Sequence, residues 1–236
     1  MKKIVLALLS MAWISAQAQT VDEVIQKYST AMGGLEAFQK VKTAKMTGSV
    51  NVQGNDLPVT FQIINGKAMR TDVEAMGQAV INAYKDGKGW KINPFMGFET
   101  ATDVEGSELI DFRSQANLAN SLMDYKNLGH TVELLGKEKV EGTDAYKIKL
   151  TSKDDGRVTT YFISVTDYGL LKTVGTRELN GNMTDVETVF GDPKDFAGLK
   201  FYMTRTQSIS GQVFQTVSLT NVELNVAVDE KIFNKQ

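Results

Sequence analysis

One helical stretch lies between two long runs of alternating apolar and polar residues, and this arrangement constrains the fold more than any other feature. The alternating runs begin at Thr43 and at Thr131, on either side of residues 103–125. Within that stretch, apolar side chains recur at spacings of three and four, which aligns them on one face of a helix: Leu109, Phe112, Ala116, Ala119 and Met123. A helix placed between two β runs most simply covers one face of a sheet. The pattern predicts a curved sheet whose open side is closed by this helix.

The alternation indicates antiparallel strands with one solvated face. In residues 57–63, for example, Leu57, Val59, Phe61 and Ile63 fall on the same side of the strand. Turn signals containing Gly, Asn and Asp recur about every eleven residues, which is the rhythm of a sandwich or barrel. We expect a mainly β fold with some α-helix, built on about eleven to thirteen strands. The in/out phase shifts between Leu219 and Val222, so a β-bulge is expected near residues 220–221.

The first 18 residues have the three parts of an export signal. Lys2 and Lys3 precede an apolar stretch over residues 4–14, and residues 16–18 read Ala-Gln-Ala. The apolar stretch is too short to span a bilayer. We expect cleavage after Ala18 and a periplasmic protein that is not integral to the membrane. Because no linker or abrupt charge shift follows, residues 19–236 are expected to form a single domain.

The mature chain is expected to begin with a helix. Thr20 and Glu23 have the spacing of a capping box, in which each side chain satisfies a free backbone N–H of the other residue. Gly33 and Gly34 follow an apolar stripe and are typical of a helix end. Residues 35–41 predict a short second helix.

The residues that carry chemistry are few. The chain has no Cys and one His, His130, with no nucleophile motif beside it. The formal net charge of −2 gives no basic footprint for nucleic acid. Acidic residues at 105, 108 and 111 are interpreted as solvated helix charges, and Asp154-Asp155-Gly156 as a hairpin turn. We expect no catalytic residue, no metal site, no cofactor and no enzymatic activity.

A dense group of large apolar residues precedes the helical stretch. Trp90, Phe95, Met96 and Phe98 lie within nine positions of one another. Two interpretations are open. These side chains belong to ordinary core, or they form the rim of an apolar cavity, where aromatics and adaptable Met suit irregular ligands.

Several short motifs occur in an order that resembles a known family. They are the segment from Tyr28 to Leu35 ending in Ala-Met-Gly-Gly-Leu, Lys42-Thr43 with Met46-Thr47-Gly48, Asp86-Gly87 with Gly89-Trp90, Gly136-Lys137-Glu138 with Val140-Glu141-Gly142, and Val222-Glu223-Leu224-Asn225. The chain resembles the exported LolA-like outer membrane lipoprotein-sorting proteins over nearly its whole mature length. The resemblance implies a half-open antiparallel barrel lidded by helices, with an apolar cavity for acyl chains. The same fold serves carriers, outer-membrane receptors and stress-sensing regulators.

The resulting hypothesis is a periplasmic carrier or binder of lipid or lipoprotein acyl chains. The alternative is an envelope module that senses lipid or binds a partner protein without transport; a hydrolase ranks last. We expect the helix to turn its apolar face inward, sheet residues to lie beneath it, and the aromatic group to lie near the opening. The candidate ligand-binding residues are Met46, Phe61, Ile63, Trp90, Phe95, Met96, Phe98, Leu109, Phe112, Ala116 and Met123.

Overall fold

A computed structural model describes residues 19–179 and 182–235; the predicted export signal lies outside these residues. The helices of the described part are α1 (Val21–Ala31), α2 (Leu35–Lys40), α3 (Gly106–Gln115), α4 (Tyr125–Leu128), and the 3-10 turns η1 (Pro94–Met96) and η2 (Glu230–Phe233). None of these is long and apolar enough to cross a membrane. The strands are β1 (Thr43–Val52), β2 (Asn55–Ile64), β3 (Ala68–Ala75), β4 (Gln78–Lys85), β5 (Lys88–Asn93), β6 (Phe98–Val104), β7 (Thr131–Val140), β8 (Thr143–Thr151), β9 (Val158–Ser164), β10 (Leu170–Leu179), β11 (Asn182–Phe196), β12 (Leu199–Ile209) and β13 (Gln212–Leu224).

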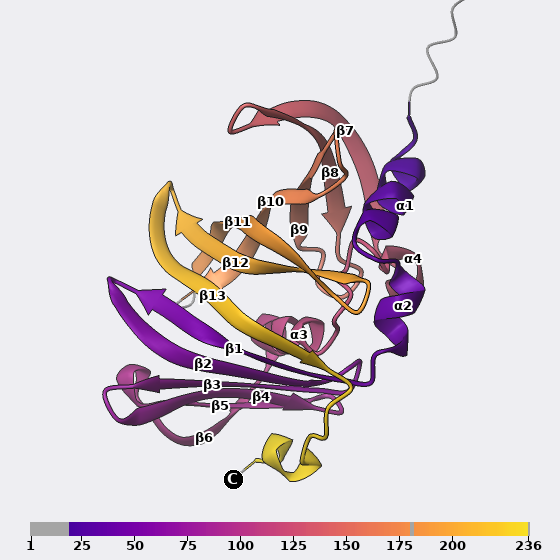
Figure 1. Cartoon of the computed structure of the whole chain (residues 1–236). Coiled ribbons are helices and arrows are strands. Elements are labelled where there is room, and N and C mark those ends of the chain that lie inside the picture. Colours follow the sequence, from indigo (N-terminus) through magenta and orange to yellow (C-terminus); the bar gives the residue numbers. More distant parts are fainter. Residues whose placement is uncertain (1–18, 180–181, 236) are drawn as a thin grey trace, which may run out of the picture.

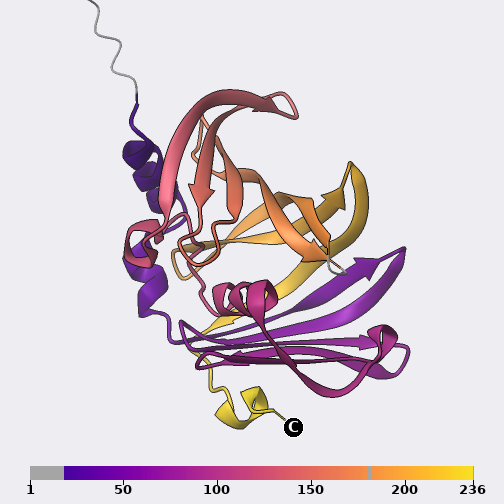
Figure 2. The same ribbon diagram turned by 180° about the vertical axis from the view of Figure 1, so that it is seen from behind.

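The described strands form one antiparallel sheet of 13 strands that curves without closing (Figure 1). Its order is β6-β5-β4-β3-β2-β1-β13-β12-β11-β10-β9-β8-β7, so β6 and β7 are the free edges. Pairing of β1 with β13 joins the first six strands to the last seven. The expected half-open barrel lidded by helices is confirmed, and α3 lies inside the curve (Figure 2).

The β1–β13 pairing contains the expected bulge. Thr47 pairs with Asn221, whereas the next residue, Gly48, pairs with Leu219, so Thr220 is the extra residue. A bulge bends its strand and increases the local twist. The prediction from the phase shift is therefore confirmed, and the bend falls where the two halves of the sheet meet.

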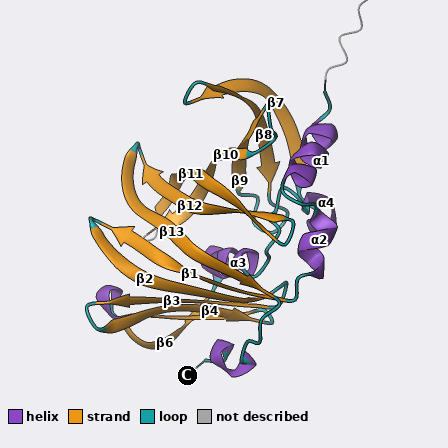
Figure 3. Ribbon diagram, viewed as in Figure 1, coloured by secondary structure: helices purple, strands orange, loops and turns teal. Residues whose placement is uncertain are grey.

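The two N-terminal helices pack at one end of the curved sheet (Figure 3). The capping box of α1 is present, because the Thr20 side chain accepts from the Glu23 N–H and the Glu23 side chain accepts from the Thr20 N–H. Gly33 and Gly34 follow the helix with positive φ, as expected. The cluster under these helices combines residues of α1 and its C-terminal cap, of α2, and of strands β8, β9, β10 and β12: Val24, Ile25, Tyr28, Met32, Phe38, Tyr146, Ile148, Leu150, Tyr161, Ile163, Leu170 and Leu199.

The predicted central helix over residues 103–125 is wrong in its extent. Residues up to Val104 belong to β6, and α3 ends at Gln115. The chain leaves the helix because the β2–β3 turn binds its last groups: the Gly66 N–H donates to the Ala116 carbonyl at 2.9 Å, and the Leu118 N–H donates to Asn65 Oδ1 at 3.0 Å. Met123 consequently lies in the turns before α4, not on α3.

The C-terminal segment covers the convex face of the sheet. The Trp90 indole N–H donates to the Phe233 carbonyl at 2.9 Å, and Arg70 Nη1 donates to the Ile232 carbonyl at 2.7 Å. The Arg70 guanidinium also stacks over the Trp90 ring, 5.5 Å from its centroid, and binds Asp72 through two nitrogens. In Figure 1, η2 and α3 lie on opposite sides of the β1–β4 layer. This small polar and aromatic cluster holds the end of the chain on the outside.

Candidate functional site

The candidate site is the concave face of the sheet beneath α3. Strand register defines that face, since Ile63 pairs with both Ala44 and Met69, and Tyr84 pairs with Met69 and Gly89. Buried apolar residues from both halves of the sheet and from α3 form one cluster there: Ala44, Met46, Ile63, Met69, Tyr84, Val104, Phe112, Ala116, Met203, Leu219 and Val222. The β1–β13 pairing therefore places the first and last strands of the chain on the same floor.

Close approach of α3 to the sheet depends on Gly89. A Cβ atom at this position would lie 2.9 Å from Leu109 Cδ1 and 3.4 Å from Phe112 Cδ2. Because Gly89 has no side chain, Leu109 and Phe112 of α3 can both contact β5 at this position. Phe112 is buried and Leu109 is partly buried. The apolar side of α3 thus packs on the β3–β5 half of the sheet.

The other side of α3 is held by ion pairs to the β9–β10 half. Arg157 Nη2 lies 2.9 Å from Asp111 Oδ1, and Arg177 binds the same carboxylate. Burial would raise the pKa of Asp155, but hydrogen bonds from Arg157 outweigh it and lower that pKa. Lys91 Nζ pairs with Glu108 at 2.8 Å on the sheet side. The carboxylates of Glu108 and Asp111 are therefore occupied by basic side chains, and the described residues hold no group of three or more metal-ligating side chains.

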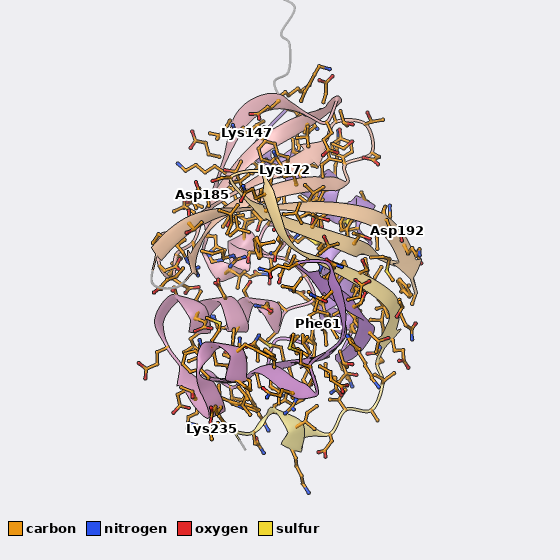
Figure 4. The ribbon with its side chains drawn as sticks, turned by 90° about the vertical axis from the view of Figure 1, so that its left-hand side faces the viewer. Phe61, Lys147, Lys172, Asp185, Asp192 and Lys235 are labelled. Atoms are coloured by element: carbon orange, nitrogen blue, oxygen red, sulfur yellow. The ribbon has the colours of Figure 1, made fainter. Side chains whose placement is uncertain are left out.

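Part of the concave face remains accessible although it faces inward. Phe61, Phe190 and Val217 are apolar and only partly buried. Figure 4 places Phe61 near the middle of the molecule, whereas Lys147, Lys172 and Lys235 lie toward its two ends. An accessible apolar surface inside a curved sheet suits a flexible apolar ligand.

The structure brings together some predicted site residues and separates others. Met46, Phe61, Ile63, Leu109, Phe112 and Ala116 all belong to the concave cluster. Met123 packs instead in the cluster beneath α1 and α2. Trp90 lies on the convex face, under the C-terminal segment.

The rest of the predicted aromatic group lies at or near the surface. In η1, Phe95 is 53% exposed and Met96 is 57% exposed. Phe98 is partly buried beneath the Lys91 ammonium, which lies 4.5 Å from its ring centroid. Phe95 and Met96 lie between β5 and β6, Phe98 is the first residue of β6, and none of the three joins the concave cluster.

Sequence reasoning missed the contribution of the last strands to the site. Met203, Val217, Leu219 and Val222 come from β12 and β13 and line the floor beside β1. Their alternation was visible, but the pairing of β13 with β1 joins residues about 175 positions apart, as in Met46 with Val222. Local periodicity carries no information about such a pairing.

A separate groove opens where the β4–β5 turn meets the C-terminal segment. It has a volume of about 760 Å³ and combines charged residues with the edges of Trp90, Leu109 and Phe233. Lys85, Asp86, Lys88, Asp103, Glu105 and Lys235 are among its lining residues. The mixture of both charge signs makes it less suited to an acyl chain than the concave face.

The cluster beneath α1 and α2 contains three tyrosines: Tyr28 of α1 and Tyr161 of β9 are buried, and Tyr202 of β12 is partly buried. Burial raises the pKa of Tyr161 to about 12, although Arg177 lowers it slightly, and burial raises the pKa of Tyr202 to about 12. Burial also raises the pKa of Tyr28 well above its usual value, with Tyr202 next in effect. The fold therefore keeps these phenols neutral in its interior.

Alkaline pH should destabilise the fold through these tyrosines. Below pH 10 Tyr161 is neutral in both states, so its contribution is intact; as pH rises from 10 toward 12 only the unfolded state ionises, and stability is lost. We expect Tyr161→Phe to reduce the drop in unfolding free energy between about pH 9 and pH 11 by about 1 kcal/mol. Urea unfolding of both proteins at the two pH values measures this. If the unfolding free energies of the parent and of Tyr161→Phe fall by the same amount between the two pH values, Tyr161 is not a buried neutral group.

Comparison with known proteins identifies the fold. No protein-family model matches the sequence, and no curated protein matches it. Solved structures do match. A LolA superfamily protein from Nitrosomonas europaea has a TM-score of 0.61 at 13% identity, with 92% of this chain and 99% of that chain covered.

Two further structures agree. A DUF1329 family protein from Desulfovibrio piger has a TM-score of 0.60 at 12% identity, covering 92% of this chain and 98% of that one. An outer membrane lipoprotein-sorting protein domain from Vibrio parahaemolyticus has a TM-score of 0.61 at 12% identity, covering 91% and 97%. The chain therefore has the LolA-like fold.

Proposed function

We propose that this protein is a periplasmic carrier or binder of lipid or lipoprotein acyl chains, which lie on the concave face beneath α3. The observation that carries the proposal is the accessible apolar surface of Phe61, Phe190 and Val217 inside a lidded sheet. The structural likeness to a lipoprotein-sorting protein domain supports it. The export signal predicted from the sequence of residues 1–18 supports the periplasmic location.

The energy available to such a ligand is sufficient. Each methylene removed from water contributes about 0.8 kcal/mol. A chain with ten buried methylenes would gain roughly 8 kcal/mol before the costs of ordering and association. Micromolar binding needs a net gain of about 8 kcal/mol, so a longer chain with more than ten buried methylenes is needed to offset those costs as well.

The two sides of α3 provide a way for the lid to open. On one side Phe112 is buried against β3–β5, and on the other Asp111 is held by Arg157 and Arg177. Ion pairs separate into water at lower cost than a buried aromatic side chain, because water solvates the freed charges. We expect the ion-paired side to open first and the helix to pivot about Phe112.

Binding of a fluorescent fatty acid tests the proposal directly. The purified mature protein should bind fluorescently labelled palmitate with a dissociation constant of about 1–100 µM, because its methylenes gain more than about 8 kcal/mol and part of that gain offsets the costs of ordering and association. Fluorescence titration measures this, and native mass spectrometry should find lipid that purifies with the protein. Absence of both signals would contradict an acyl-chain site.

An alternative function in partner binding is favoured by a second observation. Met76 is 90% exposed in the β3–β4 turn, and Met96 and Val213 are also exposed. The antiparallel order places these positions at the end of the sheet away from α1 and α2 (Figure 1).

Transfer of labelled lipid between donor and acceptor vesicles separates the two functions. A carrier accelerates transfer in proportion to its concentration, whereas a sensor binds lipid without accelerating it.

We also propose that the protein catalyses no reaction. His130 supports this, because its Nδ1 accepts a hydrogen bond from the Lys153 backbone N–H at 3.2 Å. Burial lowers the pKa of His130. Its ring is thus engaged in the turn between β8 and β9, and among the residues that the structure describes no nucleophilic side chain is its hydrogen-bond partner.

A further inference from the structure

Arg205 lies on the concave face without a counter-ion. It stands on β12 between Phe190 of β11 and Val217 of β13, and its guanidinium lies over the Phe61 ring of β2, 5.9 Å from the centroid. In the described part of the chain, no carboxylate pairs with it and no acceptor takes a hydrogen bond from it. Among residues 19–179 and 182–235, the contact with the Phe61 ring is its one specific interaction.

The other four arginines of the chain each pair with a carboxylate; Arg113, for example, pairs with Asp154. Arg157 and Arg177 both bind Asp111, and Arg70 on the convex face binds Asp72. A guanidinium is charged at any physiological pH, so it cannot avoid the cost of burial by losing its proton. An unpaired charge in a desolvated position is unfavourable until an anion arrives.

The protein around Arg205 removes much of the water that would otherwise solvate its charge. Burial lowers the pKa of Arg205, and no neighbouring charge contributes to the shift. The residue nevertheless keeps part of its surface accessible. Arg205 is therefore largely enclosed by protein while part of the residue remains accessible.

Polar groups next to Arg205 provide further hydrogen-bonding capacity. Gln207 and Gln215 lie two residues along from Arg205 and Val217, so their side chains share the concave face. Gln207 Nε2 donates to Thr188 Oγ1 at 3.4 Å, and Gln215 donates to Gln207. A small polar patch thus borders the apolar surface of Phe61, Phe190 and Val217.

We propose that Arg205 binds the anionic head of an amphiphile whose acyl chain lies along the concave face. The inference rests on the proposed function and adds the ligand class: a carboxylate or phosphate oxyanion joined directly to the apolar chain. A guanidinium can bind two oxygens of such a group at once. The head therefore fixes the position of the ligand, and the chain supplies most of the affinity.

Competition against a neutral probe tests the proposal. N-phenylnaphthylamine reports occupancy of the apolar face, and the competitors are palmitate, cetyl alcohol and inorganic phosphate. The first two have the same chain and differ in the charge of the head. A charge-assisted hydrogen bond contributes a factor of roughly 10 to 100. We therefore expect palmitate to displace half of the probe at a concentration that is lower, by that factor, than the concentration of cetyl alcohol with the same effect.

The variants then assign the difference to Arg205. Arg205→Met should remove the advantage of palmitate while leaving displacement by cetyl alcohol unchanged, and Arg205→Lys should keep part of it. Arg205→Met should also unfold at a temperature no lower than the parent, because it removes an unpaired buried charge. A marked loss of stability in this variant would assign Arg205 a structural role and overturn the proposal.

The remaining outcomes separate the inference from the function on which it rests. Equal displacement by palmitate and cetyl alcohol in the parent would overturn the role of Arg205 and leave the acyl-chain site intact. Displacement of the probe by phosphate as readily as by palmitate would show a site for free anions and overturn the lipid head. If neither the probe nor cetyl alcohol binds, the acyl-chain site and the inference both fail.

Discussion

Replacing Gly48 with alanine should lower the unfolding free energy by about 3–5 kcal/mol, which corresponds to a fall in melting temperature of roughly 10 °C. An ideal Cβ at Gly48 would lie 2.0 Å from the Ser218 carbonyl oxygen and 2.8 Å from Leu219 Cα. Both are backbone atoms of β13 at the bulge, so neither can rotate away as a flexible side chain would. The strands must separate where the two halves of the sheet are joined.

Gly191→Ala is the matched control for this variant. Gly191 also lies within a strand, β11, and a Cβ there would make an ordinary contact of 3.7 Å with Thr204 Cβ. Thermal unfolding followed by circular dichroism should give a melting temperature close to that of the parent for Gly191→Ala and a much lower one for Gly48→Ala. Equal melting temperatures would show that the β1–β13 bulge adjusts freely, which would contradict a rigid junction.

The bulge illustrates how much of the fold the sequence could predict. The phase shift between Leu219 and Val222 located the bulge on β13, because side-chain alternation is a local property of a strand. The partner strand was not predictable from alternation, since many strands have similar faces. The need for glycine at position 48 comes from the close approach of the β13 backbone, and a sequence pattern does not show which strand approaches it.

The site shows the same division between local and tertiary information. Leu109, Phe112 and Ala116 were predicted to face inward from helical spacing, and the structure places them in the concave cluster. The early end of α3 was missed because the groups that terminate it, on Asn65 and Gly66, belong to a distant turn. Alternation assigned Trp90 to a face of β5 but could not say that this face is convex.

Replacing Phe112 with aspartate should detach α3 from the sheet and weaken binding of labelled palmitate by tenfold or more. Phe112 is 5% exposed and packs against Ala116 and the floor beneath it. Truncating a buried Phe costs about 3–5 kcal/mol, and an unpaired carboxylate in the same position adds a desolvation penalty. The helix can avoid that penalty by swinging outward, which removes the apolar cover from the bound chain. Circular dichroism should show that the strands remain folded, because α3 lies outside the ladder of strand pairings.

Ser114→Asp separates loss of the lid from addition of a charge. Ser114 lies on the same helix and is exposed. Ser107 is a poor control, because its hydroxyl donates to Glu178 and an aspartate at position 107 would place its carboxylate next to that of Glu178. We expect Ser114→Asp to bind palmitate as the parent does, and Phe112→Leu to lose only a small part of the affinity. Weaker binding in Phe112→Asp alone would assign the effect to the apolar face of α3. If Phe112→Asp and Ser114→Asp both bind palmitate as the parent does, the acyl chain does not lie beneath α3, and α3 does not act as a lid over the ligand.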